Sequence, residues 1–232
     1  MKKLLSIIMC LSLIFTFAAC SNTAQEEETA SQSSQTSTQS QTQSSSQTDG
    51  STGSNVLVAY FAVAENSEVD AASSASVVTV NGEAQGIVQA LARMIQNETG
   101  GDLFSIQTSV DYPADRNDLI EYAQEEQDSN ARPQLTAHIE NLDDYDTIFI
   151  GYPIWWYDLP QVMYSFFDEY DFSGKTIIPF CVHNGSQFTG TIQTIQELEP
   201  NAKVITDGFT VNESNAADSA EDIAAWIEEL NL

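Results

Sequence analysis

The sequence predicts an α/β fold in which helices cover both faces of a doubly wound, five-stranded parallel sheet. From Asn55 onward, short apolar runs rich in β-branched and aromatic residues alternate with longer runs whose apolar residues recur every three or four positions. The first pattern is typical of strands buried on both faces, and the second of amphipathic helices. Because each strand precedes a helix, right-handed crossovers place helices on both sides of one parallel sheet.

The first two units are predicted from contrasting patterns. Val56–Ala62 (VLVAYFA) is continuously apolar, as in a buried central strand, and Gly86–Asn97 carries its apolar residues at helical spacing. Asp102–Gln107 is the second strand, and Arg116–Asp128 is a polar helix. A sheet order of 2-1-3-4-5 then places the switch in strand order beside the first strand.

The remaining units follow the same alternation. The expected strands are Thr147–Gly151 (TIFIG), Thr176–Val182 (TIIPFCV) and Lys203–Asp207, and the expected helices are Gln161–Asp168, Gly190–Leu198 and Ala216–Leu230. Together they define one folded domain, residues 56–232.

The segment between the first strand and its helix, Val63–Gln85, is much longer than the usual connection of about 2–6 residues. Within it, a strand-like run from Val77 to Val80 precedes Asn81-Gly82, a dipeptide that favours a tight hairpin turn. We therefore expect a β-hairpin insertion after the first strand. It is either a decoration of the fold or a flap over a site at the first strand–helix turn.

The N-terminus has the features of an export signal. Lys2 and Lys3 precede an apolar run, Leu4–Phe17, which is too short to span a bilayer comfortably. The sequence Phe17-Ala18-Ala19-Cys20 resembles the lipobox of bacterial lipoproteins, a resemblance that implies lipidation of Cys20 and attachment to the extracytoplasmic face of the cell membrane. Ordinary secretory cleavage, without lipidation, is the alternative.

A polar tether is expected between this signal, residues 1–20, and the folded domain. Residues 21–55 contain no aromatic residue and are dominated by Ser, Thr and Gln, so they cannot bury enough apolar surface to fold. A coil of this length spans roughly 30–35 Å.

Composition excludes two classes of protein. The 7 Lys and Arg residues stand against 34 Asp and Glu residues, a formal net charge of −27, which argues against general nucleic-acid binding. Hydrophobic residues form 42% of the chain, which is enough for one core and excludes global disorder.

The sequence lacks the usual motifs of hydrolases and of metal sites. There is no Gly-x-Ser-x-Gly motif, and two distant histidines offer no metal-ligand spacing. Removal of Cys10 with the signal and lipidation of Cys20 leave Cys181 without a disulfide partner, and its apolar surroundings predict a buried structural thiol.

The loop after the third strand is the candidate ligand site. Residues 151–160 (GYPIWWYDLP) hold two tryptophans and two tyrosines between prolines, at the sheet edge where ligands of open parallel sheets bind. Aromatic side chains there would form a flat wall for a planar ring. Alternatively, one or both tryptophans complete the core beneath the loop.

GYPIWW after TIFI, followed by SFFDEYDFSGKTIIPFCVHNGS, resembles the flavodoxin-like family, in its bacterial lipoprotein branch. The resemblance covers nearly all of Val56–Leu232 and implies noncovalent FMN binding with electron transfer. Carried over by position, the isoalloxazine would be lined by Tyr152, Pro153, Ile154, Trp155 and Trp156, and its polar edge by His183, Asn184, Gly185 and Ser186.

The phosphate end departs from that family. Its members carry hydroxyl residues after the first strand and at the first helix start, where this chain has Ala62 and Gly86, Ile87 and Val88. Backbone amides at the helix start would then have to hold the phosphate, aided by Ser73, Ser74 or Ser76.

Two function classes follow from these observations. The first is a lipid-anchored FMN protein that transfers electrons to an unidentified redox partner, or hydride as an oxidoreductase acting on NAD(P)H or a quinone. The second is a non-redox binding module whose aromatic loop stacks another planar ligand after decay of the phosphate site.

Overall fold

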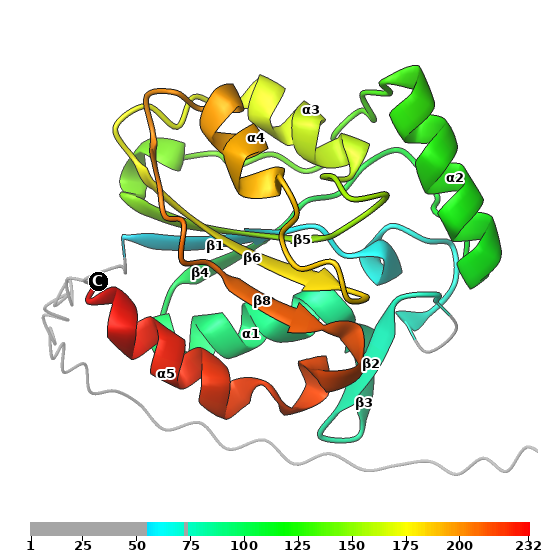
Figure 1. Ribbon diagram of the computed structural model, residues 1–232, viewed down its shortest axis with the longest axis horizontal. Helices are drawn as coiled ribbons and strands as arrows, with labels where there is room; N and C mark the ends of the chain where they lie inside the picture. Colours follow the sequence, from blue (N-terminus) through cyan, green and yellow to red (C-terminus); the bar gives the residue numbers. More distant parts are fainter. Residues whose placement is uncertain (1–54, 72–73) are drawn as a thin grey trace, which may run out of the picture. The chain divides into compact units, whose positions relative to one another are not determined.

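The computed structural model describes residues 55–71 and 74–232 (Figure 1). The predicted signal peptide, Cys20, nearly all of the tether and Ser73 lie outside these residues. The main sheet is parallel, with the order β4-β1-β5-β6-β7, and β8 pairs with β6 beyond β7. Its strands are β1 (Val56–Tyr60), β4 (Asp102–Ser105), β5 (Thr147–Pro153), β6 (Thr176–His183), β7 (Lys203–Val204) and β8 (Phe209–Asn212). The predicted fold class and order 2-1-3-4-5 are confirmed.

Helices cover both faces of the sheet (Figure 1). On one face lie α1 (Ile87–Thr99) and α5 (Ala220–Leu230), and on the other lie α2 (Arg116–Ser129), α3 (Gln161–Glu169) and α4 (Thr191–Leu198). Side chains alternate along each strand, so that in β1 Val58 packs toward α1 whereas Leu57 and Ala59 pack toward α3. The continuous apolar runs therefore arise from burial on both faces.

The predicted hairpin is present. β2 (Val77–Val80) pairs antiparallel with β3 (Glu83–Gly86), and Asn81 and Gly82 have φ angles of 53° and 86°. Positive φ at both central residues defines a type I′ turn, which explains the Asn-Gly sequence. The last strand residue, Gly86, is also the N-cap of α1, so the hairpin leads directly into that helix.

The fifth strand differs from the prediction. Instead of one strand over Lys203–Asp207, β7 ends at Val204 and β8 begins at Phe209. Pro179 of β6 faces this break and has no N–H with which to continue the ladder. Gly208 lies in this break, where no larger residue fits, because a β-carbon there would lie 2.4 Å from the Pro179 carbonyl oxygen. The absent N–H of Pro179 and the close approach of Gly208 to its carbonyl oxygen thus split the strand.

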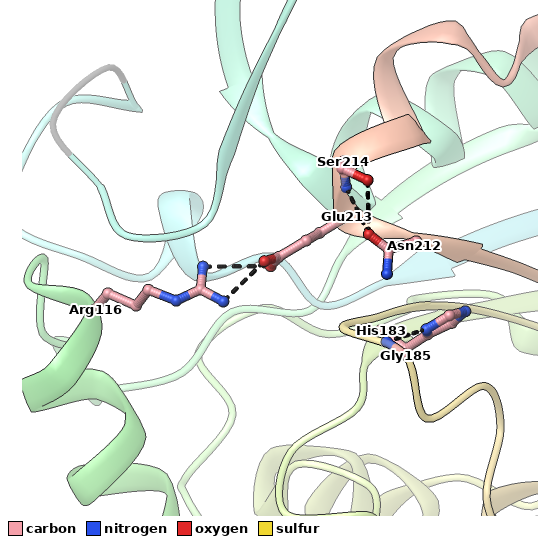
Figure 2. Close-up of polar contacts among 6 residues, drawn as sticks. All are labelled: Arg116, His183, Gly185, Asn212, Glu213 and Ser214. Carbon is pink, nitrogen blue, oxygen red and sulfur yellow. Dashed lines mark hydrogen bonds and ion pairs between the residues drawn. The ribbon is translucent and has the colours of Figure 1, made fainter.

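The C-terminal helix is also shorter than expected. A 3₁₀ segment, η4 (Glu213–Asp218), precedes α5 and begins directly after β8. Asn212 caps it by accepting a hydrogen bond from the Ser214 amide at 3.0 Å (Figure 2). None of the helices in the described part of the chain has the length and apolar character needed to cross a bilayer.

Candidate functional site

A cavity of about 530 Å³ lies where β5 and β6 end. Eight of the residues predicted for the flavin ring line it: Pro153, Ile154, Trp155, Trp156, His183, Asn184, Gly185 and Ser186. Tyr152 does not; its ring is fully buried, and its hydroxyl lies 3.0 Å from Thr191 Oγ1. The two predicted loops therefore meet at one place, with Tyr152 packed beneath them.

The aromatic loop forms a tight turn with an unusual backbone. Trp155 and Asp158 exchange two main-chain hydrogen bonds of 3.0 and 2.9 Å, and the residues between them, Trp156 and Tyr157, have φ angles of 48° and 66°. Glycine and asparagine normally occupy such positions, since large side chains strain the backbone there. Bulky residues at strained positions are typical of sites where the side chains serve a ligand.

The three aromatic side chains of this turn have different surroundings. Trp155 is half-buried and packs edge-to-face on Phe61 and Tyr112, with ring centroids 5.6 and 5.4 Å apart. Trp156 is 41% exposed and donates its Nε1–H to the Ile120 carbonyl oxygen of α2 at 2.9 Å, and Tyr157 is 73% exposed. One tryptophan thus extends the core and also lines the cavity, while the other two rings lie at its mouth.

The loop after β6 lines the same cavity. The Ile154 amide donates to the Val182 carbonyl oxygen at 2.9 Å, which ties the two loops together. The Gly185 amide donates to His183 Nδ1 at 2.8 Å (Figure 2), so the neutral imidazole carries its proton on Nε2. Desolvation lowers the pKa of His183, which favours this neutral form. The cavity wall therefore includes a neutral imidazole whose free ring nitrogen is a donor.

Cys181 lies below this loop. Its thiol is fully buried and lies 3.2 Å from Thr210 Oγ1, and burial raises its pKa to about 12. The predicted structural thiol is confirmed. Within residues 55–71 and 74–232, no group of His, Cys, Asp and Glu side chains is arranged to hold a metal ion.

Comparison with known proteins agrees with this geometry. The sequence pattern that defines the flavodoxin family matches residues 76–230. The chain belongs to the flavodoxin family. No curated protein sequence matches this flavodoxin significantly.

Solved structures resemble this flavodoxin over most of its folded part. A candidate flavoprotein from Bacteroides uniformis is 27% identical, with a TM-score of 0.57, and the match covers 76% of this chain and 99% of that one. A candidate flavoprotein from Bacteroides eggerthii is 24% identical, with a TM-score of 0.58, over 76% and 98% of the two chains. These similarities agree with the observed sheet order.

Four of the residues predicted for the phosphate end lie outside the cavity lining. Ala62, Gly86, Ile87 and Val88 are buried between the sheet and α1, and none of them lines it. The Gly86 amide donates to Gln89 Oε1, and the Ile87 amide to the Ser76 carbonyl oxygen, both at 3.1 Å. Two amides expected to hold a phosphate are therefore already bonded within this flavodoxin.

A carboxylate lies beside this helix start. Glu65 accepts hydrogen bonds from Gln89 Nε2 at 2.8 Å, Ser105 Oγ at 3.0 Å and the Tyr60 hydroxyl at 3.3 Å. Burial raises its pKa, although the Ser105 and Tyr60 hydroxyls and the charge of Arg93 oppose the shift. The start of α1 thus faces a half-buried acidic side chain of the protein itself.

Several cavity residues were not predicted. Leu119, Ile120 and Ala123 form an apolar wall from α2, Ala75 comes from the inserted segment, and Val182, Arg116 and Glu213 also line the cavity. Ser76, one of the hydroxyl residues expected at the phosphate end, lines the cavity as well, whereas Ser74 does not. Of the described part of the insertion, Ala75 and Ser76, directly before the hairpin, line the cavity, and β2 and β3 do not. The sequence could have indicated Arg116 as a site residue, since it is one of only five basic residues beyond the predicted signal peptide.

Proposed function

We propose that this flavodoxin binds FMN with its ring system in the cavity and transfers electrons. The observation that carries the proposal is the strained turn from Trp155 to Asp158, whose aromatic side chains line one cavity together with the loop from His183 to Ser186. Family membership supports it. Similar proteins include one from Lactobacillus acidophilus, 18% identical with a TM-score of 0.49 over 72% and 97% of the chains, which is described as a complex with FMN.

The cavity fits a flat, partly polar ring. Trp155, Ile154 and Leu119 provide apolar lining, and Tyr157, which also lines the cavity, is 73% exposed. FMN, when bound, would supply reversible acceptance of electrons, with or without protons. The Nε2–H of His183 would donate a hydrogen bond at the polar edge and so favour negative charge there.

The cellular setting belongs to the same proposal. The signal-like sequence ending at Cys20 supports export and lipidation, and the tether would hold the folded domain at the extracytoplasmic face of the cell membrane. Incorporation of a palmitate analogue into the wild-type protein, and its loss in Cys20→Ser, would support this anchoring. Incorporation that survives the substitution would contradict it.

The partner in electron transfer decides between a carrier and an oxidoreductase. Trp156 and Tyr157 are exposed at the cavity, and a second reactant such as a quinone or NAD(P)H would approach the flavin past them. Steady oxidation of NAD(P)H with a quinone acceptor would identify an enzyme. Reversible reduction without such turnover would identify an electron carrier.

Titration of the purified full-length protein with FMN, followed by tryptophan fluorescence, tests the binding itself. We expect strong quenching that Trp155→Ala greatly reduces. Trp226→Phe is the matched control. Trp226 belongs to α5 and packs on Phe149 and Phe209, outside the cavity. Absence of quenching and of bound flavin would overturn the proposal.

That negative result would favour the second candidate, a non-redox binding module. The observation in its favour is the closed start of α1, where the Gly86 and Ile87 amides are bonded and Glu65 is the neighbouring anion. Quenching by a planar ligand without phosphate, such as an indole or an aryl glycoside, would then support it.

A further inference from the structure

An ion pair joins two sides of the cavity. Arg116, the first residue of α2, donates from its two terminal nitrogens to the carboxylate of Glu213, the first residue of η4, at 2.8 and 3.3 Å. Figure 2 shows the Glu213 side chain extending toward the guanidinium. The two residues are 97 positions apart in sequence, so the pair is a tertiary contact between two separate elements of the cavity wall.

This pair is the charged part of an otherwise uncharged site. Of the described residues that line the cavity, Arg116 and Glu213 alone carry a formal charge when His183 is neutral. The whole chain has a net charge of −27, so a cavity with an arginine and no excess of acid is a local exception. An anionic ligand would meet its one favourable partner at Arg116.

Hydroxyl groups from the insertion lie in the same region. Ser76 lines the cavity together with Arg116, and the neighbouring Ser74 has a buried hydroxyl that bonds to none of the described residues. Ser74 is 7% exposed. Buried hydroxyls are normally satisfied, so the Ser74 hydroxyl is available to a polar partner two residues before Ser76 of the cavity lining.

We propose that Arg116 binds the phosphate of FMN. Until FMN binds, the Glu213 carboxylate pairs with the Arg116 guanidinium, and the phosphate then replaces that carboxylate. This inference rests on the proposed function and assigns the phosphate to a place other than the start of α1. There, the Gly86 and Ile87 amides are already bonded and Glu65 would repel an anion. At the cavity, a bidentate guanidinium and the Ser76 hydroxyl offer donors that suit phosphate oxygens.

Exchange at Arg116 is energetically accessible. The side chains of Arg116 and Glu213 are 52% and 29% exposed, and ion pairs this close to solvent contribute little stability. A phosphate carries more charge than the carboxylate and has three acceptor oxygens. Glu213 is itself partly exposed, so its carboxylate would stay hydrated after release instead of being left buried without a partner.

Paired titrations with FMN and riboflavin test the assignment, because riboflavin has the same ring and lacks the phosphate. For the full-length protein we expect Arg116→Gln to weaken FMN binding by about ten- to a hundredfold and to leave riboflavin binding unchanged. Glu213→Gln should strengthen FMN binding several-fold without affecting riboflavin. Inorganic phosphate should compete with FMN only at far higher concentration, and it should not compete with riboflavin.

Arg132→Gln is the matched control, since Arg132 is also an exposed arginine paired with a carboxylate, Asp168, and it lies outside this cavity. It should leave both affinities unchanged. If FMN binds and Arg116→Gln weakens neither flavin, or both equally, the phosphate assignment is overturned and FMN binding stands. If the wild-type protein binds neither flavin, the proposed function and this inference both fail.

Discussion

The ring of Phe180 lies directly over the α-carbon of Gly151 in the neighbouring strand. The two residues are paired in the parallel register of β5 and β6, and a β-carbon at Gly151 would lie 2.1 Å from the ring. These strands carry the two loops of the cavity, Gly151 only a few residues before the aromatic turn. The packing beneath the site therefore depends on glycine at position 151.

Gly151→Ala should consequently destabilise the fold. The added methyl group cannot be accommodated unless Phe180 or the strand moves, which costs about 1–3 kcal/mol in a packed core. Urea unfolding measures the loss. Gly190→Ala is the control, because no atom lies within 4 Å of its β-carbon position and its φ is −102°. Equal unfolding midpoints for the two variants would contradict the packing described here.

Tyr157 gives a prediction in the opposite direction. Its φ of 66° is unfavourable for a side chain, and the ring is 73% exposed. Tyr157→Gly should therefore stabilise the protein by about 0.5–1 kcal/mol, because the strain outweighs the lost contacts. The same change should weaken FMN binding several-fold through loss of an aromatic surface.

Tyr157→Phe separates these two effects, since it keeps the ring and the strain. Its stability and its FMN affinity should match those of the wild-type protein. Thermal unfolding and fluorescence titration report the two quantities separately. A Tyr157→Gly variant that is less stable than Tyr157→Phe would show that the ring contributes to folding.

The alternation of apolar strands and amphipathic helices was sufficient to predict the strands and the doubly wound fold class, because burial on both faces leaves a local signature in each strand. The hairpin was predictable for the same reason, since Asn81-Gly82 specifies its own turn. The break between β7 and β8 was missed because it depends on Pro179, which lies in another strand. Gly208 acquires its meaning only when the two strands are adjacent.

In the site too, features set by local sequence were predicted, and features set by contacts between distant segments were not. The two loops at the strand ends were predicted from their own composition and from the family resemblance. The Arg116–Glu213 pair was not, because its members are separated by 97 positions and each is unremarkable within its own segment. The hydrogen bonds of the Gly86 and Ile87 amides were not predicted either, because they depend on where Gln89 and Ser76 lie in the folded chain.

His183 should be found as the Nε2–H tautomer with a pKa below its ordinary value of 6.5. The Gly185 amide donates to Nδ1, and protonation of that nitrogen would break the hydrogen bond. Long-range nitrogen–proton correlation spectra over a pH series measure both properties, and His138→Gln, on the exposed surface, assigns the signals. An Nδ1–H tautomer, or a pKa above 6.5, would contradict the geometry of the loop.

Stability should fall between about pH 4.5 and pH 7 because of Glu126. Its side chain is buried beside the Tyr112 hydroxyl, 3.4 Å from each carboxylate oxygen, and burial raises its pKa from 4.5 to about 7. The folded state thus holds a proton that the unfolded state loses at lower pH. Rising pH therefore favours unfolding across this interval, by about 1 kcal/mol after allowance for solvent screening.

Urea unfolding at pH 5, 6, 7 and 8 measures this slope. Glu126→Gln should reduce it, whereas Glu125→Gln, exposed on the same helix, should not. Glu199 and Glu65 act in the same direction, since burial raises the pKa of Glu199 to about 7 and also raises that of Glu65, so part of the slope remains in Glu126→Gln. Tyr112→Phe removes a hydroxyl that lowers the pKa of Glu126 and should extend the loss of stability to higher pH. Stability that rises steadily from pH 5 to pH 8 would contradict the raised pKa of Glu126.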